Sequence, residues 1–288
     1  MFANLRANLF VLLQYLLPQH AISRLMHVFT RLRVRWIKNA FTRWFIGHFG
    51  IDMSEAAEED YRAYPDFNHF FTRALKPGAR PLAREPGSVL CPVDGTVSQA
   101  GHIQGEALFQ AKGHTFSLRA LLGGSERWAQ QFRNGEFATL YLSPRDYHRI
   151  HMPLTGTLKE MIHVPGRLFS VNPFTTRKVP GLFARNERVA CLFDTEAGPM
   201  GLVLVGAINV ASIETVWQGV ITPPAGKRLR FWDYPERNVV LEAGAELGRF
   251  NMGSTVIVLF GPERVEWDKR IVADATVRMG ERLGRRKT

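Results

Sequence analysis

The sequence predicts an α+β protein in which amphipathic N-terminal helices precede a mainly antiparallel β core, built as a sandwich or a barrel-like sheet. Apolar residues recur at helical spacing over roughly the first 50 residues. From about residue 88, short apolar runs rich in β-branched residues alternate with turn signals. The composition, 45% hydrophobic and 22% charged over 288 residues, is that of a globular protein long enough for a large core.

Residues 1–50 should form a membrane-surface helical region of two helices separated by Pro18. In the second helix, one face is apolar and rich in aromatic rings, and the opposite face carries cations. The apolar face comprises Ile22, Leu25, Met26, Phe29, Leu32, Trp36, Ile37, Ala40 and Trp44, and the cationic face Arg24, Arg31, Arg35 and Lys38. No Asp or Glu occurs between Met1 and Ile51. This imbalance favours a helix at a membrane surface over one packed on the protein's own core.

The net charge of +11 predicts an anionic partner. Much of the excess lies at the two ends of the chain, the second cluster being Arg282, Arg285, Arg286 and Lys287. This distribution favours an anionic membrane surface over nucleic acid, for which no motif is evident. The apolar run 9–17 is too short to cross a bilayer, and a basic segment follows it instead of a small-residue cleavage site. We therefore expect a peripheral protein on the cytoplasmic side of the cell membrane.

The remaining residues, 51–288, should form one domain that begins with a connector of acidic residues, phenylalanines and prolines up to about residue 85. A helix is expected over Ser117–Phe132, and Asn134-Gly135 indicates a hairpin. Strands are expected at Val89–Val97, Phe137–Leu142, Val189–Phe193, Leu202–Ile213, Thr215–Ile221, Val239–Leu241 and Thr255–Phe260. Cys91 and Cys191 adjoin apolar runs and should be buried thiols.

Three local features could carry chemistry. A glycine precedes a serine at Gly253-Ser254, which permits strained backbone at a nucleophile, although a turn between strands is the simpler interpretation. His148 and His151 lie three residues apart without a third ligand at typical spacing, so we expect acid–base or structural roles and no metal. Asp94-Gly95 alone indicates a hairpin turn. Together, Asp94, His151 and Ser254 supply a carboxylate, a base and a nucleophile, but the sequence does not show that they meet.

An ordered set of motifs along almost the whole chain resembles the bacterial phosphatidylserine decarboxylases. In chain order these motifs are Phe67–Phe71, Pro92–Gly95, Tyr141–His151 (YLSPRDYHRIH), Pro165–Asn172, Phe183–Arg188, Val205–Ala207, Ser212–Glu214 and Gly248–Thr255. The family usually has leucine where this chain has Met252, which exchanges one apolar side chain for another. A single Gly-Ser-Thr would not indicate a family, whereas the ordered set of motifs is highly specific for this one.

The resemblance implies a proenzyme whose catalytic domain, 51–288, cuts itself between Gly253 and Ser254 into a large chain and a small partner chain. Ser254 would attack the Gly253 carbonyl and become a covalent pyruvoyl group, with His151 as base, oriented by Asp94. The pyruvoyl carbonyl would form a Schiff base with phosphatidylserine and withdraw electrons as the carboxylate leaves, giving phosphatidylethanolamine. His148 would return the proton. The resemblance also implies a homodimer.

Two other functions remain open from the residues alone. A membrane-surface serine hydrolase or acyltransferase could use Ser254, His151 and Asp94 without self-cleavage, although the Gly-x-Ser-x-Gly elbow is missing. A basic module that binds lipid would need no catalytic residues, but its charge should spread over the core instead of gathering at the ends.

Overall fold

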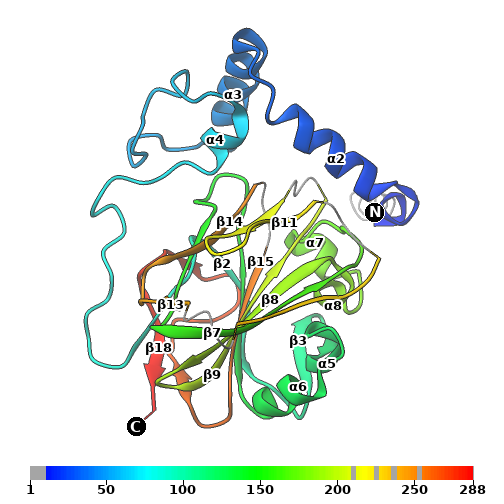
Figure 1. Ribbon diagram of the computed structural model, residues 1–288, viewed down its shortest axis with the longest axis vertical. Coiled ribbons are helices and arrows are strands. Elements are labelled where there is room, and N and C mark those ends of the chain that lie inside the picture. Colours follow the sequence, from blue (N-terminus) through cyan, green and yellow to red (C-terminus); the bar gives the residue numbers. More distant parts are fainter. Residues whose placement is uncertain (1–10, 209–211, 224–226, 235–238, 252–254, 288) are drawn as a thin grey trace.

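A computed structural model describes residues 11–208, 212–223, 227–234, 239–251 and 255–287 (Figure 1). Its largest sheet is antiparallel throughout and confirms the predicted α+β class. Within the described residues the sheet ends at β12 and β17, so it is open and not a closed barrel. Its strand order is β12 (Arg230–Asp233), β7 (Gly156–Val164), β8 (Arg188–Thr195), β9 (Gly198–Val205), β15 (Thr255–Phe260), β5 (Glu136–Tyr141), β2 (Gly95–His102) and β17 (Thr276–Val277), with β13 (Val240–Leu241) also on β7.

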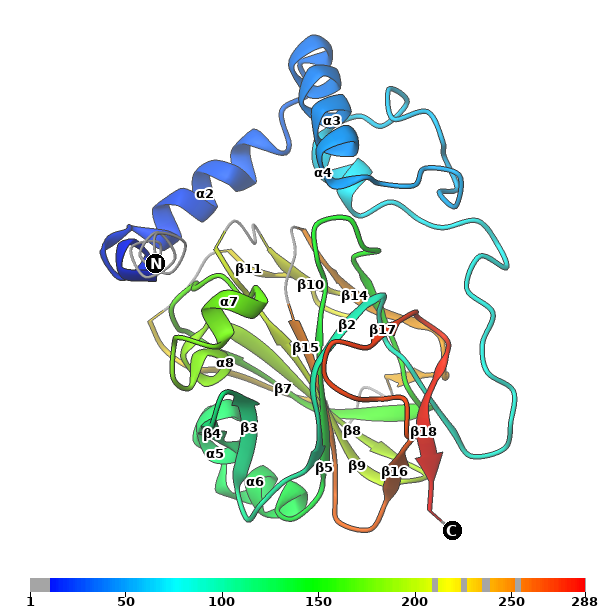
Figure 2. The same ribbon diagram turned by 180° about the vertical axis from the view of Figure 1, so that it is seen from behind.

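Smaller sheets and short helices surround this sheet (Figures 1 and 2). One small sheet has the order β11 (Gly219–Thr222), β10 (Ile213–Thr215), β14 (Glu246–Phe250) and β6 (Arg149–His151). Another has the order β1 (Ser88–Leu90), β18 (Arg282–Arg286) and β16 (Val265–Trp267). The hairpin β3 (Ala107–Ala111) and β4 (His114–Ser117) lies on one side of the large sheet with α5 (Leu118–Leu121), α6 (Glu126–Phe132), α7 (Pro173–Thr176) and α8 (Leu182–Arg185).

Strand β15 lies at the centre of the large sheet and confirms the strand predicted at Thr255–Phe260. Every residue of its sequence TVIVLF is buried, and each pairs with a residue of β5 on one side and of β9 on the other. A continuous run of apolar and β-branched side chains fits this position, because both faces and both edges of the strand are covered.

The predicted second helix is two helices, α2 (Gln19–Phe29) and α3 (Arg35–Phe49), and the prediction of one continuous helix is wrong. The break follows Thr30, whose backbone leads into a non-helical stretch before Val34 caps α3. No helix of the described residues is long and apolar enough to span a bilayer. Figure 1 shows both helices at the end of the molecule away from the C-terminus.

The face that α2 turns toward the protein is polar. Gln19 and Ser23 are its buried residues, whereas Leu25 is 70% exposed and Val28 61% exposed. The Gln19 side chain accepts a hydrogen bond from the backbone N–H of Leu168 (2.8 Å), inside the motif Pro165–Asn172. Gln14, in the helical stretch before Pro18, likewise accepts from Ser170 (2.7 Å). Polar hydrogen bonds therefore hold this helix on the core and leave Leu25 and Val28 facing outward, whereas Phe29 packs against Phe41 of α3.

Lys38 does not belong to an outward cationic face as predicted. It is 4% exposed, and its ammonium donates to the carbonyls of Tyr61 (3.3 Å), Arg62 (3.0 Å) and Tyr64 (2.8 Å). This contact ties α3 to the connector, because a buried ammonium needs several acceptors to replace its hydration.

A second, smaller core joins α3 to α4 (Phe67–Phe71). Its buried members are Phe45, Ile51, Phe67, Phe70 and Phe71. The cluster crosses the boundary predicted between residues 50 and 51, so the helical region packs against the first residues of the domain that follows.

Three turn or helix predictions in the β core are wrong. The helix expected over Ser117–Phe132 is interrupted between α5 and α6 by Gly123 and Gly124, both at positive φ. Asn134-Gly135 joins α6 to β5 instead of two strands. Asp94-Gly95 is not a hairpin turn, because Gly95 is the first residue of β2. Cys91 and Cys191 are both buried, as predicted.

Gly95 is required by a close approach of two strands. A Cβ at this position would lie 2.2 Å from the carbonyl oxygen of Tyr141 in β5. We expect Gly95→Ala to lower the free energy of unfolding by roughly 1–3 kcal/mol, because one strand must shift. The measurement is a urea titration. Gly47→Ala is the matched control, since no atom lies within 4 Å of its Cβ position in α3 and alanine favours a helix interior by up to about 1 kcal/mol. Equal effects of the two changes would contradict the steric argument.

Candidate active site

Strand pairing places the histidine motif on β14, the strand that ends shortly before the Gly-Ser segment. β6, which contains Arg149–His151, pairs with β14 so that His151 lies opposite Glu246. At the other end of this strand pair, next to Arg149 and Arg249, the backbone N–H of Phe250 donates to the His148 carbonyl (3.1 Å). Two stretches about a hundred residues apart in the chain are thus hydrogen-bonded at the point where β14 ends.

Gly253 and Ser254 lie outside the described residues, but both flanks of their segment are fixed. On one side, the buried Asn251 donates from its backbone to the Ser212 carbonyl (2.9 Å) and from its side chain to the Ser212 hydroxyl (2.6 Å). On the other side, Thr255 begins β15, opposite Tyr141 of β5 and Val205 of β9. The segment therefore connects the end of β14 to the central strand of the large sheet.

Asp94 is buried, and its carboxylate is bound by Arg80. Arg80 donates from Nε to Oδ1 (2.9 Å) and from Nη2 to Oδ2 (2.5 Å), while Oδ1 also accepts from the backbone N–H of Met279 (2.8 Å). Arg80 in turn donates to Glu55 (2.7 Å). These bonds to both carboxylates raise the pKa of Arg80, so the guanidinium stays charged.

Both ring nitrogens of His151 have partners other than Asp94. Nδ1 donates to the Gly244 carbonyl (2.8 Å), which can only accept, so Nε2 carries the lone pair and accepts from the Tyr147 hydroxyl (3.1 Å). The orienting contact from Asp94 to His151 that the resemblance implied is thus not formed in this structure. The two residues are still neighbours, since the His151 backbone N–H donates to the Pro92 carbonyl (2.9 Å). Burial lowers the pKa of His151 and raises that of Tyr147 to about 12.

His148 is fully buried and stacks on Phe71, with the ring centres 4.1 Å apart. Its Nε2 donates to the Ser143 carbonyl (3.1 Å), whereas Nδ1 has no hydrogen-bond partner among the residues described. Burial lowers the pKa of His148 to about 3, and the nearby charge of Arg73 lowers it further. The ring is therefore neutral at ordinary pH and presents an unused acceptor inside the protein.

Two cavities lie along the segment from Leu142 to Tyr147. A polar cavity of about 230 Å³ is lined by side chains that include Arg73, Arg80, Asp94, Asp146 and Tyr147. An apolar cavity of about 580 Å³ is enclosed between the N-terminal helices and the core, and its lining includes Leu13, Leu17, Met26, Phe41, Phe45, Phe71, Leu142 and Val171. Phe71, which lines the apolar cavity, stacks on His148, and Tyr147, which lines the polar cavity, precedes His148 in the chain.

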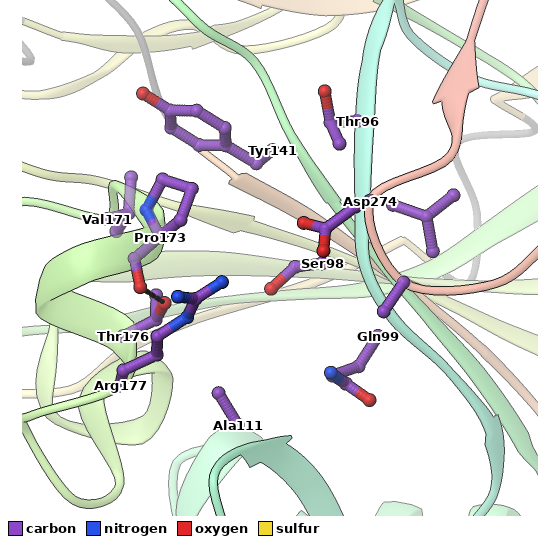
Figure 3. A pocket seen from close by; sticks show the side chains of 12 residues that line it. Thr96, Ser98, Gln99, Ala111, Tyr141, Val171, Pro173, Thr176, Arg177 and Asp274 are labelled. Atoms are coloured by element: carbon purple, nitrogen blue, oxygen red, sulfur yellow. Dashed lines mark hydrogen bonds between the residues drawn. The ribbon is translucent and has the colours of Figure 1, made fainter.

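A third cavity, of about 60 Å³, lies beyond Tyr141 (Figure 3). Figure 3 shows Arg177 and Asp274 directed toward Ser98, while the Tyr141 hydroxyl is turned away from them. This volume has room for only a few water molecules and is too small for a lipid headgroup. Among the described residues, no group of three or more His, Cys, Asp or Glu side chains could hold a metal ion.

The family model described as phosphatidylserine decarboxylase matches residues 67–285, and a further model described as PSD matches residues 9–50. The chain belongs to the phosphatidylserine decarboxylase family. A phosphatidylserine decarboxylase proenzyme of Pseudomonas putida is 60% identical over 282 residues, covering 97% of this chain and 98% of the relative. The proenzyme of Ectopseudomonas mendocina is 58% identical over 282 residues, covering 97% and 99%. These relatives confirm the family expected from the motifs and identify the chain as a decarboxylase.

Several residues of this decarboxylase site were not predicted from the sequence. Tyr147 lies inside the histidine motif, so its proximity to His151 could have been inferred. Arg73 and Arg80 lie in the connector, where no local pattern indicates which carboxylate they approach. Gly244 contributes a backbone carbonyl, for which a sequence carries no side-chain signal.

The buried neutral His148 should make the decarboxylase less stable in acid. In the unfolded chain this histidine takes up a proton as the pH falls through its ordinary value of 6.5, whereas in the folded protein it stays neutral down to about pH 3. The unfolded state therefore binds more protons in this window, and stability should fall with decreasing pH by up to about 1.4 kcal/mol per pH unit. Urea titrations at pH 7 and 5 should show a smaller loss for His148→Gln, which cannot take up this proton. Equal losses would contradict a neutral buried ring.

Proposed function

We propose that this decarboxylase converts phosphatidylserine to phosphatidylethanolamine with a pyruvoyl group that it makes from Ser254. The observation that carries the proposal is the pairing of β6 with β14, because it brings the histidine motif to the strand that ends just before the Gly-Ser bond. The family membership and the proenzyme names of the relatives support it further.

Self-cleavage would proceed by serinolysis. The Ser254 hydroxyl attacks the Gly253 carbonyl and replaces the amide bond by an ester, with the proton passing to the freed amine. Elimination then breaks the ester, releasing the Gly253 carboxylate and leaving dehydroalanine at residue 254. Its imine tautomer takes up water and loses ammonia, which leaves a ketone. The pyruvoyl group supplies the electron sink that accepts the electron pair when the carboxylate leaves as CO₂.

His151 is the base that we assign to serinolysis. Its Nε2 lone pair is held in place because Nδ1 donates to the Gly244 carbonyl, and Tyr147 occupies that lone pair in this structure. In this assignment Gly244 fixes the tautomer, and Asp94 acts on His151 only through its charge and through the Pro92–His151 backbone contact.

His148 is the group that we assign to proton transfer during decarboxylation. Among the described residues its buried Nδ1 has no hydrogen-bond partner, and its backbone carbonyl accepts from the N–H of Phe250, four residues before Ser254. The neutral ring would take a proton at Nδ1 from the substrate ammonium as the imine forms and, because burial lowers its pKa, would readily return that proton to carbon.

The two products of cleavage should remain one folded unit. The small chain, from residue 254 onward, would contain β15, whose residues pair with β5 and β9, both in the large chain. It would also contain β17, paired with β2, and β18, paired with β1. None of these hydrogen bonds depends on the peptide bond that is cut.

The proposed substrate is a lipid, and the apolar cavity has the character that acyl chains require. Its wall is formed by α3 and the stretch before Pro18 on one side and by the core on the other. Outside this cavity, α2 and α3 expose Leu25, Val28 and Trp36. Apolar side chains on the outer face of a cationic helical region support binding at a membrane surface.

Mass spectrometry of the purified protein, combined with hydride trapping, tests the proposal. We expect a large chain ending at Gly253 and a small chain of roughly 35 residues that lacks an amino terminus, because a pyruvoyl group has no amine. Borohydride added during turnover should reduce the imine and fix the headgroup of the substrate on residue 254. An active, uncut chain, or an acyl ester on Ser254, would instead identify a serine hydrolase.

Variants of the two histidines distinguish self-cleavage from decarboxylation. His151→Ala should leave the precursor uncut, because serinolysis has lost its base. His148→Ala should still be cut but decarboxylate at least about a hundredfold more slowly, because only proton return is impaired. Asp94→Ala should impair cleavage, with loss of the Arg80 contact as an additional cause. Equal cleavage defects in the two histidine variants would contradict this division of roles.

Sedimentation with anionic vesicles tests which surface of the protein binds the membrane. Leu25→Gln and Trp36→Gln should each weaken binding by roughly 1–2 kcal/mol, because these side chains are 70% and 74% exposed and would enter the lipid. Arg24→Gln and Arg35→Gln should each weaken binding by up to about 1 kcal/mol at low salt. Val272→Gln is the matched control, since this valine is 58% exposed but lies in the β core. Equal loss with the control would show that α2 and α3 are not the binding surface.

A further inference from the structure

Arg73 is a buried arginine whose charge no partner satisfies. It is 5% exposed, its Nε and Nη1 have no hydrogen-bond partner in the part of the chain that the structure describes, and Nη2 reaches the Arg145 carbonyl only at 3.5 Å. Within the described residues no carboxylate lies within ion-pairing distance of its guanidinium, which sits 5.5 Å from the centre of the Phe70 ring. Burial lowers its pKa.

Two other arginines show how this protein supplies acceptors to the guanidinium groups that it buries. Arg188 is 2% exposed and donates to the carbonyls of Leu121 (2.7 Å), Asn186 (2.8 Å) and Ala120. Arg80 is bound by Asp94 and Glu55. A buried cation without such partners costs several kcal/mol, so its retention at Arg73 points to an anion that arrives from outside.

The position of Arg73 indicates where that anion would come from. The guanidinium lines the polar cavity of about 230 Å³. Two residues earlier, Phe71 stacks on His148 and lines the apolar cavity. Between them, the Thr72 carbonyl accepts from Arg149, which adjoins His148 (2.9 Å). One short segment of chain thus contributes to both cavities and to the packing of the candidate active-site histidine.

We propose that Arg73 binds the phosphodiester of the phospholipid headgroup. This inference rests on the proposed function, in which a lipid places its acyl chains in the apolar cavity and its headgroup beside His148. The free N–H groups of a guanidinium form strong, charge-assisted hydrogen bonds to phosphate oxygens. The departing carboxylate is a poor candidate for this contact, because a cation that binds it in the ground state would oppose its loss as neutral CO₂.

The test compares Arg73→Gln and Arg73→Lys with Arg145→Gln, which removes an exposed arginine from the same cavity. Calorimetry with glycerophosphoethanolamine, a headgroup with phosphate but no carboxylate and no acyl chains, measures the contact without turnover. Arg73→Gln should weaken its binding at least about tenfold, Arg73→Lys less, and Arg145→Gln by less than about threefold. For decarboxylation, Arg73→Gln should raise KM at least about tenfold and change kcat less.

Thermal stability separates binding from a structural role. Arg73→Gln should be cut normally and unfold at the same or a higher temperature than the wild type, because it removes an unpaired buried charge. Added glycerophosphoethanolamine should raise the unfolding temperature of the wild type more than that of the variant. Unchanged binding in Arg73→Gln, or a variant that melts lower and binds normally, would overturn the proposal. If Arg73→Gln weakened the binding of glycerophosphoserine but not that of glycerophosphoethanolamine, Arg73 would contact the carboxylate. That result would also overturn the proposal.

The proposed function and this inference can fail separately. If wild-type enzyme shows no cleavage and no hydride-trapped adduct, the pyruvoyl mechanism is wrong whatever Arg73 does. If cleavage and trapping occur but headgroup binding does not depend on Arg73, the mechanism stands and the phosphodiester contact is wrong.

Discussion

The hydrogen bonding of β15 on both of its edges is the constraint on which the rest of the structure depends. It fixes Thr255 between β5 and β9, so the chain that precedes this residue must enter the large sheet at a defined place. β14 reaches the same place from another sheet, where its pairing with β6 sets the position of the histidines. Two independently hydrogen-bonded sheets thereby determine the geometry on either side of residues 252–254. Such a junction holds its flanks even when the bond between them is broken.

The polar groups around this junction are not hydrogen-bonded as a linear Asp–His–Ser triad. Asp94 is joined to Arg80 and Glu55, a network that connects the start of β2 to the connector. His151 is instead held by a backbone carbonyl and a tyrosine. A carbonyl fixes the same tautomer as a carboxylate would but brings no full charge, so its hydrogen bond raises the pKa of His151 by less than burial lowers it. The histidine is consequently kept neutral, as a base must be before it accepts a proton.

The sequence was most informative where one local pattern decides the structure. The run at Thr255–Phe260 predicted a buried strand because its composition suits no exposed position. The 3.6-residue periodicity predicted helices near the N-terminus, but not the break after Thr30. Lys38 was assigned to the outer face because its buried acceptors, the carbonyls of residues 61–64, depend on the path of a connector without periodicity. The Arg80–Asp94 and His151–Gly244 contacts were inaccessible for the same reason, since they join irregular segments.

If the protein binds a membrane as proposed, the exposed apolar side chains of α2 have a consequence for how long it stays there. Because Gln19 and Ser23 are the buried residues of α2, the exposed Leu25 and Val28 could enter lipid without leaving a buried position. Arrival and departure then need no conformational step. The residence time of the proposed membrane-bound state would depend on how much apolar surface the lipid covers and on how many anionic headgroups lie beneath it. A membrane enriched in its own anionic lipid would hold such a protein longer, and conversion of that lipid to a zwitterionic one would release it.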